Sequence, residues 1–169
     1  MTKEGDIGVD IAVAIDEPSW RDTLPNPEDC CRRSVIAALA GRIDDEMSEV
    51  SVLLTNDAHM TRLNRQYRQR ASSTNVLSFP ADRSAAPTGE ARLLGDVVLA
   101  HETVVAEAAA QGKSVADHVA HLLIHGTLHL LGLDHQSDAD AEHMEALEVG
   151  VLKGLGIGDP YETPEMARE

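Results

Sequence analysis

Aromatic side chains are scarce in this 169-residue chain, which contains only Trp20, Tyr67, Phe79 and Tyr161. Proteins that bind single-stranded nucleic acid by base stacking need a platform of such side chains. This chain can hardly build one. If it handles a nucleic acid, it must therefore hold it by charge or through a metal, and we expect it to bind the isolated strand weakly.

Cysteine is almost absent too. Cys30 and Cys31 are neighbours, and side chains of neighbours on a regular element point apart, so we expect no disulfide between them. Two cysteines are too few for a disulfide framework, which fits a reducing compartment. No apolar run approaches the roughly 18 residues of a membrane span. Residues 1–10 also lack the basic-then-apolar pattern of a signal peptide. These absences predict a soluble, cytoplasmic protein with no membrane partner.

Positive charge is in deficit, because the formal net charge is −15. Such a balance argues against a broad basic surface, and we expect no DNA partner. Residues 61–92 nevertheless carry a net +4, which leaves −19 for the rest of the chain. The arginines of this segment are Arg62, Arg65, Arg68, Arg70, Arg83 and Arg92. They are either ordinary solvated side chains or one basic face that holds a phosphate backbone locally.

Alternation, capping residues and turn residues divide the chain into strands early and helices late. Strands are expected at 7–16, 49–55, 74–80 and 93–100, and Pro80 marks the third as an edge strand. Helices are expected at 27–40, 57–68, 101–111, 115–131 and 138–156. Their predicted N-caps are Asn26, Asn56, Ser114 and Ser137, and their predicted C-terminal glycines are Gly41, Gly112 and Gly132.

This order of elements predicts the α+β class. We expect a single small domain over residues 1–158, with a mixed sheet of about four strands packed with about five helices. Residues 159–169 are polar and are expected to form a loose tail.

The stretch "HGTLHLLGLDH", residues 125–135, predicts a metal site. His125 and His129 lie one turn apart on the same face of a helix. Gly132 lets the chain turn, so that His135 returns as the third ligand. Three neutral imidazoles suit one divalent ion, with zinc as the expected metal, and they leave a fourth position open for water. Water bound in such a site has a pKa of about 7.

Two neighbouring residues leave alternatives open. His121 also shares the face of His125, but steps of about 6 Å along the helix are too long for three stacked histidines to meet one ion. Asp134 can hydrogen-bond a ligand imidazole and fix its tautomer, act as a general base, or serve only the turn after Gly132. Zinc proteases with a similar histidine spacing carry a glutamate, their general base, at the position that Gly126 occupies here. The glycine therefore disfavours peptide hydrolysis by the usual route.

The histidine block resembles the signature of the YbeY family, bacterial endoribonucleases and rRNA maturation factors. "LNRQYRQRASSTNVLSFP" (63–80) is similar to the family's second motif, an arginine after an aromatic followed by a T-[DN]-V-L-S-F-P strand. "LLGDVVLA" (93–100) is similar to a third, shorter block. One departure is Leu133, where relatives usually carry tyrosine or histidine. It is not a ligand position, so we expect a changed lining and intact metal binding.

The resemblance implies one metal, usually taken as zinc, on His125, His129 and His135, and an arginine at Arg68 that matters for activity. It also implies single-stranded RNA as substrate, maturation of the 3′ end of small-subunit rRNA, and ribosome quality control with the small subunit or its proteins as partner. We expect a metal-bound water to attack the phosphodiester while Arg68 stabilises the developing charge. The RNA is expected between the metal helix and residues 62–83.

Several roles stay open at this point. Arg65, Arg70 and Arg83 are weaker candidates for phosphate contacts, and Ser78 for the lining of the cleft, although "VLSFP" equally fits a core strand. Arg68 itself fits a surface arginine at a helix end. Two other functions compete: a non-enzymatic ribosome assembly factor with a structural metal, which the acidic body favours, and a metalloprotease, which Gly126 disfavours.

Overall fold

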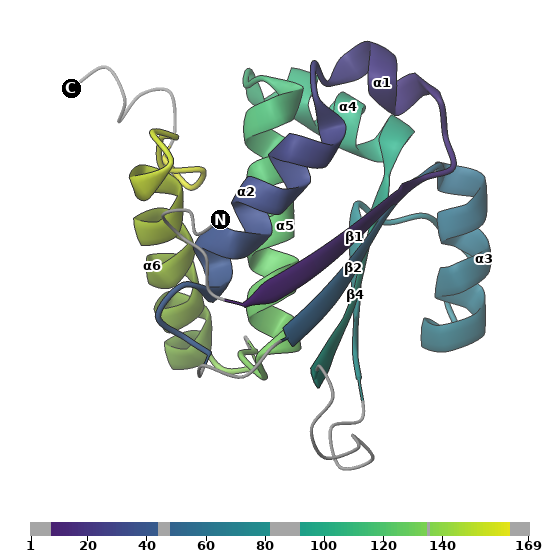
Figure 1. Ribbon diagram of the computed structural model, residues 1–169. Helices are drawn as coiled ribbons and strands as arrows, with labels where there is room; N and C mark the ends of the chain where they lie inside the picture. Colours follow the sequence, from purple (N-terminus) through teal and green to yellow (C-terminus); the bar gives the residue numbers. More distant parts are fainter. Residues whose placement is uncertain (1–7, 44–47, 82–91, 135, 163–169) are drawn as a thin grey trace.

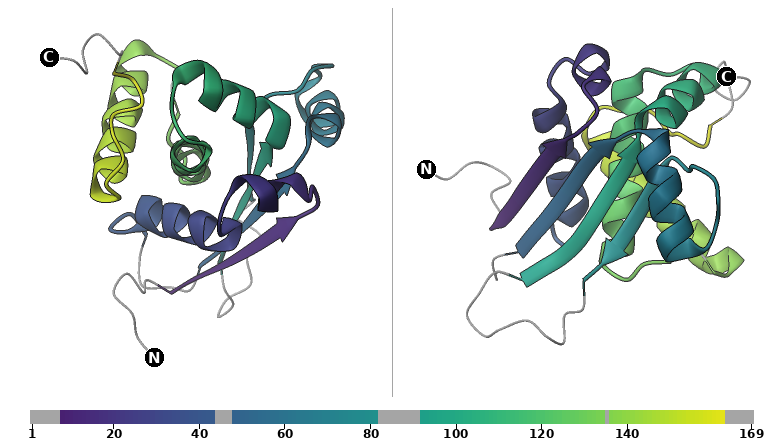
Figure 2. Two further views of the ribbon diagram at one scale, coloured as in Figure 1. Left: turned by 90° about the horizontal axis from the view of Figure 1, so that it is seen from above. Right: turned by 90° about the vertical axis from the view of Figure 1, so that its right-hand side faces the viewer.

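One mixed sheet of four strands, in the order β1-β2-β4-β3, forms the centre of the part of the chain that the structure describes (Figures 1 and 2). The computed structural model describes residues 8–43, 48–81, 92–134 and 136–162. The strands are β1 (Val9–Ile15), β2 (Ser48–Thr55), β3 (Val76–Pro80) and β4 (Arg92–Ala100). The first two and β4 run parallel, whereas β3 pairs antiparallel with β4. Among the described strands, none pairs with the other edge of β3.

Helices cover both faces of this sheet. They are α1 (Ser19–Thr23), α2 (Pro27–Leu39), α3 (Asp57–Arg68), α4 (His101–Gln111), α5 (Val115–Leu130) and α6 (Asp138–Gly154). Figure 2 shows α3 alone on one face, α2 and α5 on the other, and α6 outside α5. The α5 helix therefore lies between the sheet and α6.

The helix ends follow local chemistry. The predicted N-cap side chains of Asn26, Asn56, Ser114 and Ser137 each accept the backbone N–H three residues further on. Gly112 is the C-cap of α4, as predicted. The predicted Gly41 and Gly132 each come one residue after the cap. Gly132 has φ +96°, a conformation that favours glycine, and it turns the chain just below the histidines.

Burial on two sides leaves α5 only a narrow exposed stripe. One core cluster joins the sheet to α2 and α5 through residues such as Val97 and Leu123. A second joins α5 to α6 through Ile124, Leu128 and Met144. Beyond the first turn of α5, the only residues that are not buried are His121, His125 and His129. The packing that stabilises this helix thus also leaves these three histidines as its partly exposed side chains.

The predicted fold class, the mixed sheet and the edge position of β3 are confirmed. The five-residue α1 was not predicted. Both cysteines lie on α2 as free thiols. At the start of the predicted tail, Tyr161 hydrogen-bonds to Glu148 on α6, so this part packs on the body, while residues 163–169 lie outside the described ranges. No helix among the described residues is long and apolar enough to cross a membrane.

Candidate metal centre and cleft

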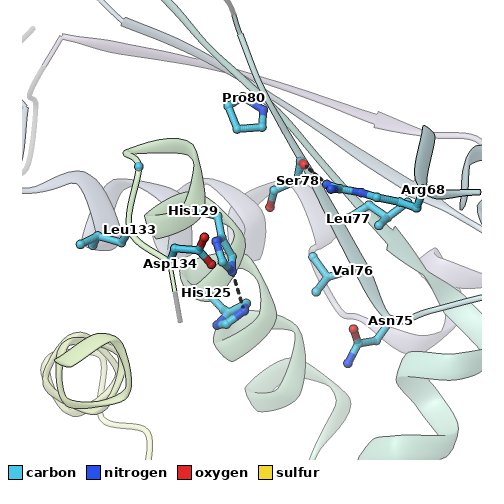
Figure 3. Close-up of a pocket in the computed structure, with 11 residues that line it drawn as sticks. Arg68, Asn75, Val76, Leu77, Ser78, Pro80, His125, His129, Leu133 and Asp134 are labelled. Carbon is cyan, nitrogen blue, oxygen red and sulfur yellow. Dashed lines mark hydrogen bonds between the residues drawn. The ribbon is translucent and has the colours of Figure 1, made fainter. Parts of the chain in front are cut away.

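A cleft of about 560 Å³ lies between the histidine stripe of α5 and the free edge of β3 (Figure 3). Its walls come from the end of α3, from β3, and from α5 with the turn that follows. The lining residues are Arg68, Asn75, Val76, Leu77, Ser78, Pro80, His125, His129, Gly132, Leu133 and Asp134. The sequence singled out one segment around the histidines and another around the edge strand. Most of the residues of interest in both segments therefore line one cleft.

Two of the three predicted metal ligands face each other in this cleft. The Nε2 atoms of His125 and His129 are 3.1 Å apart. Two nitrogens bound tetrahedrally to zinc at about 2.0–2.1 Å are about 3.3 Å apart, so the pair fits one ion. The predicted third ligand, His135, lies outside the described residues, and no three histidine, cysteine or carboxylate side chains among the described residues are arranged to hold one metal ion. Asp134 lines the same wall, where its carboxylate points toward His129 (Figure 3).

The carboxylate of Glu148, which the sequence did not reveal as a site residue, hydrogen-bonds to the ring nitrogen of His125 that faces away from the cleft. Glu148 on α6 is fully buried, and its Oε2 lies 2.6 Å from Nδ1 of His125. Burial alone would raise the pKa of Glu148, but hydrogen bonds from His121, His125 and Tyr161 outweigh it and lower the pKa to about 2. Glu148 is therefore a charged acceptor. Its sequence signal is its place on the buried face of α6, one turn from Met144 and from Leu152.

His121 contacts the carboxylate of Glu148 and not the cleft. Its Nε2 lies 2.7 Å from Oε1 of Glu148, and its ring centroid is 6.4 Å from that of His125. The residue does not line the cleft. The rise of about 6 Å per four residues along α5 thus separates His121 from the pair formed by His125 and His129.

Arg68 reaches the opposite wall of the cleft from the C-terminal end of α3. Its Nη2 donates a hydrogen bond of 3.0 Å to the carbonyl oxygen of Ser78 (Figure 3). Its guanidinium carbon lies 5.9 Å from the centre of the Phe79 ring, and Tyr67 packs edge-on against the same ring. These contacts fix the exposed guanidinium at the rim of the cleft.

Of the other candidate residues, Ser78 lines the same cleft as Arg68, and the arginines differ in position. The Ser78 hydroxyl donates to the Gly126 carbonyl, 3.0 Å away, so it ties β3 to α5. Arg70 lines a neighbouring cavity of about 290 Å³ that also includes Arg68. Arg65 is exposed on α3 and lines neither cavity. Arg83 lies outside the described residues.

The free edge of β3 adds backbone groups to the same wall. Ala100 donates its N–H to the carbonyl of Asn75, and antiparallel partners alternate in this bonding. The register therefore turns the backbone groups of Val76 and Ser78 away from β4, along the cleft. Arg68 occupies the Ser78 carbonyl, so this edge offers the N–H groups of Val76 and Ser78, which suit an anion, beside the carbonyl of Val76.

Gly126 lies where α5 packs closest to the sheet. A Cβ atom at this position would come within 2.8 Å of Val97 Cγ1 and 2.9 Å of Ser78 Oγ. Position 126 therefore points at β3 and β4 and has no room for a glutamate. The base of the zinc proteases is absent here, and the packing excludes it.

Gly126→Ala should destabilise the protein by about 1–3 kcal/mol through overpacking, even though alanine favours a helix interior. The matched control is Gly150→Ala on α6, where nothing lies within 4 Å of the added Cβ. That change should stabilise the protein by about 0.5–1 kcal/mol. Urea unfolding of both variants measures the difference, and two changes of the same sign would contradict the close packing at Gly126.

Comparisons with known proteins agree on one family. A family model described as "Endoribonuclease YbeY" matches residues 24–156. An "Endoribonuclease YbeY" of Paramagnetospirillum magneticum is 48% identical over 160 residues, which span 92% of this chain and 97% of that protein. One of Azorhizobium caulinodans is 46% identical over 159 residues, with 92% and 98% covered.

A solved structure is similar in fold. The solution structure of TM1509 from Thermotoga maritima matches with a TM-score of 0.52 and 19% sequence identity, and it covers 92% of this chain and 97% of the other. At this identity the likeness concerns the arrangement of strands and helices alone.

Proposed function

The chain belongs to the YbeY family of endoribonucleases, hydrolases of phosphodiester bonds, and we propose that it cleaves single-stranded RNA in the cleft between α5 and β3 with one divalent metal ion. The observation that carries the proposal is the pair of Nε2 atoms, 3.1 Å apart, on one wall of this cleft. Arg68 lines the same cleft. Phosphodiester cleavage needs both a nucleophile and positive groups around the phosphoryl oxygens.

The metal would be held by His125, His129 and His135, with zinc as the ion that three neutral imidazoles suit. When bound, such an ion supplies an activated water and a positive charge for the phosphoryl oxygens. His125 is suited to this role because its Nδ1 is engaged by Glu148, which leaves Nε2 for the cleft. Asp134 lines the same wall, and it would orient a ligand or accept a proton.

The opposite wall would hold the RNA backbone. The planar guanidinium of Arg68 suits two phosphoryl oxygens at once, and its bond to the Ser78 carbonyl keeps it at the rim. The outward N–H groups of Val76 and Ser78 can each donate to a phosphate oxygen of the RNA along β3. These contacts orient the scissile bond and stabilise the charge that builds up on it. The contacts proposed here involve the RNA backbone and not the bases, which fits a substrate recognised as a single strand and not by its sequence.

The biological substrate we propose is the 3′ end of small-subunit rRNA, matured in the cytoplasm and monitored there during ribosome quality control. The net charge of −15 disfavours tight binding of isolated RNA. An acidic body can instead dock on basic ribosomal proteins, which would present the RNA to the cleft. The small subunit or its proteins are therefore the partners we expect.

The test is cleavage of a labelled single-stranded RNA that spans the 3′ end of small-subunit rRNA. Protein treated with a chelator should lose the activity, and added Zn²⁺ should restore it, while the same sequence in a duplex stays intact. An unstructured protein offered as substrate should stay intact in the same tube. Cleavage that resists the chelator would contradict the metal-dependent reaction. Binding to the small subunit without any cleavage would favour an assembly factor with a structural metal.

A further inference from the structure

We propose that Glu148 is a positioning residue, which fixes the tautomer and the ring orientation of His125 so that Nε2 faces the cleft. The inference deepens the proposed function, because it assigns the support behind one metal ligand. Glu148 lies on α6, fully buried, and does not itself line the cleft. It acts through His125 rather than on the substrate.

The contact between the two side chains determines where the proton of His125 sits. Oε2 of Glu148 lies 2.6 Å from Nδ1 of His125. A hydrogen bond of this length between a ring nitrogen and a carboxylate oxygen has the ring N–H as its donor, so the contact places the proton on Nδ1. The lone pair of the neutral ring then lies on Nε2, which is 3.1 Å from Nε2 of His129. A ligand imidazole needs this tautomer, and an acceptor behind the ring commonly sets it.

The carboxylate is itself held in one orientation. Its other oxygen, Oε1, lies 2.7 Å from Nε2 of His121 and accepts a hydrogen bond from the Tyr161 hydroxyl. The donors come from α5 and from the segment after α6, so Glu148 cannot swing away from His125 without losing them. A buried carboxylate without partners would be strongly destabilising. The hydrogen bonds that offset the burial of Glu148 thus also orient its carboxylate toward His125.

A purely structural carboxylate would tie the same elements together without affecting the metal, so the test measures metal affinity. Glu148→Gln keeps the volume but replaces one acceptor oxygen by a donor group and removes the charge. The control is Glu145→Gln, the same change on the same helix. Glu145 is exposed and lines a small cavity of about 210 Å³ behind His125. The Glu145→Gln variant therefore measures the effect of losing one negative charge near His125 without the hydrogen bond.

Competition with a coloured chelator for Zn²⁺ should show affinity about 10- to 100-fold weaker for Glu148→Gln. Affinity should be unchanged for Glu145→Gln. A folded Glu148→Gln protein that binds Zn²⁺ as tightly as the wild type overturns the proposal. These measurements involve no RNA, so a protein that fails to cleave RNA but shows the predicted affinities would contradict only the proposed function.

A second measurement needs no variant. Long-range ¹⁵N–¹H spectra of the wild-type protein, freed of metal by a chelator, should show His125 protonated at Nδ1 and not at Nε2. The opposite tautomer overturns the proposal, even if Glu148→Gln proves unable to fold or the wild type binds no Zn²⁺.

Discussion

His129→Ala should abolish RNA cleavage and weaken Zn²⁺ binding by about 10²–10³-fold. Zinc on the four ligands of zinc-finger peptides is bound with about 10–16 kcal/mol, so one ligand contributes about 2.5–4 kcal/mol. Nε2 of His129 lies 3.1 Å from Nε2 of His125, and alanine removes this facing nitrogen. Cleavage of the labelled RNA and chelator competition for Zn²⁺ measure the two effects on one preparation.

The matched control is His143→Ala, which removes an exposed histidine of α6. This variant should cleave RNA and bind Zn²⁺ like the wild type. Purifying all three proteins in the same way also detects a contaminating nuclease. If His129→Ala cleaved RNA at the wild-type rate, the activity would come from a contaminant or from a route without the metal, and the proposed centre would be wrong.

The histidine pair could be predicted because its geometry is local. Helical periodicity alone places His125 and His129 on one face, and the cap at Ser114 and the turn at Gly132 fix where that helix begins and ends. The same holds for the edge strand, since Pro80 lacks the N–H that a central strand needs. Each of these features depends on residues a few positions apart.

Glu148 could not be assigned a role from the sequence because its partner comes from another helix. It lies 23 residues from His125 along the chain, and only the packing of α6 on α5 brings them together. The short α1 is also a product of tertiary structure. It has no side-chain cap, and its Trp20 is buried and donates to the distant Thr55 carbonyl.

Tyr67 shows the limit of helical periodicity. The pattern of α3 places it on one face with Met60 and Leu63, yet Met60 is buried whereas Tyr67 is 58% exposed. The last turn of α3 lies beside β3, the edge strand of the sheet that the described residues form. The ring packs edge-on against Phe79 instead. This contact positions the next residue, Arg68, so an apparent core residue supports the cleft.

Arg68→Ala should slow RNA cleavage by about 10²–10³-fold while Zn²⁺ stays bound, since removing one preorganised donor to a developing oxyanion has this effect in other enzymes. Arg68 contacts the Ser78 carbonyl and the Phe79 ring, not the histidine pair, so the metal should not leave. Arg68→Lys should restore only part of the rate, because an ammonium group lacks the planar pair of donors. Single-turnover cleavage and chelator competition measure both quantities.

Arg62→Ala is the matched control, because Arg62 is exposed on the same helix and its guanidinium approaches His59, not the cleft. It removes the same charge from α3, so a general loss of attraction for RNA should appear equally in both variants. A rate lowered only in Arg68→Ala assigns the effect to the position at the rim of the cleft. Equal rates in Arg68→Ala and wild type, with Zn²⁺ bound in both, would leave Arg68 a surface arginine at a helix end and move the RNA path away from β3.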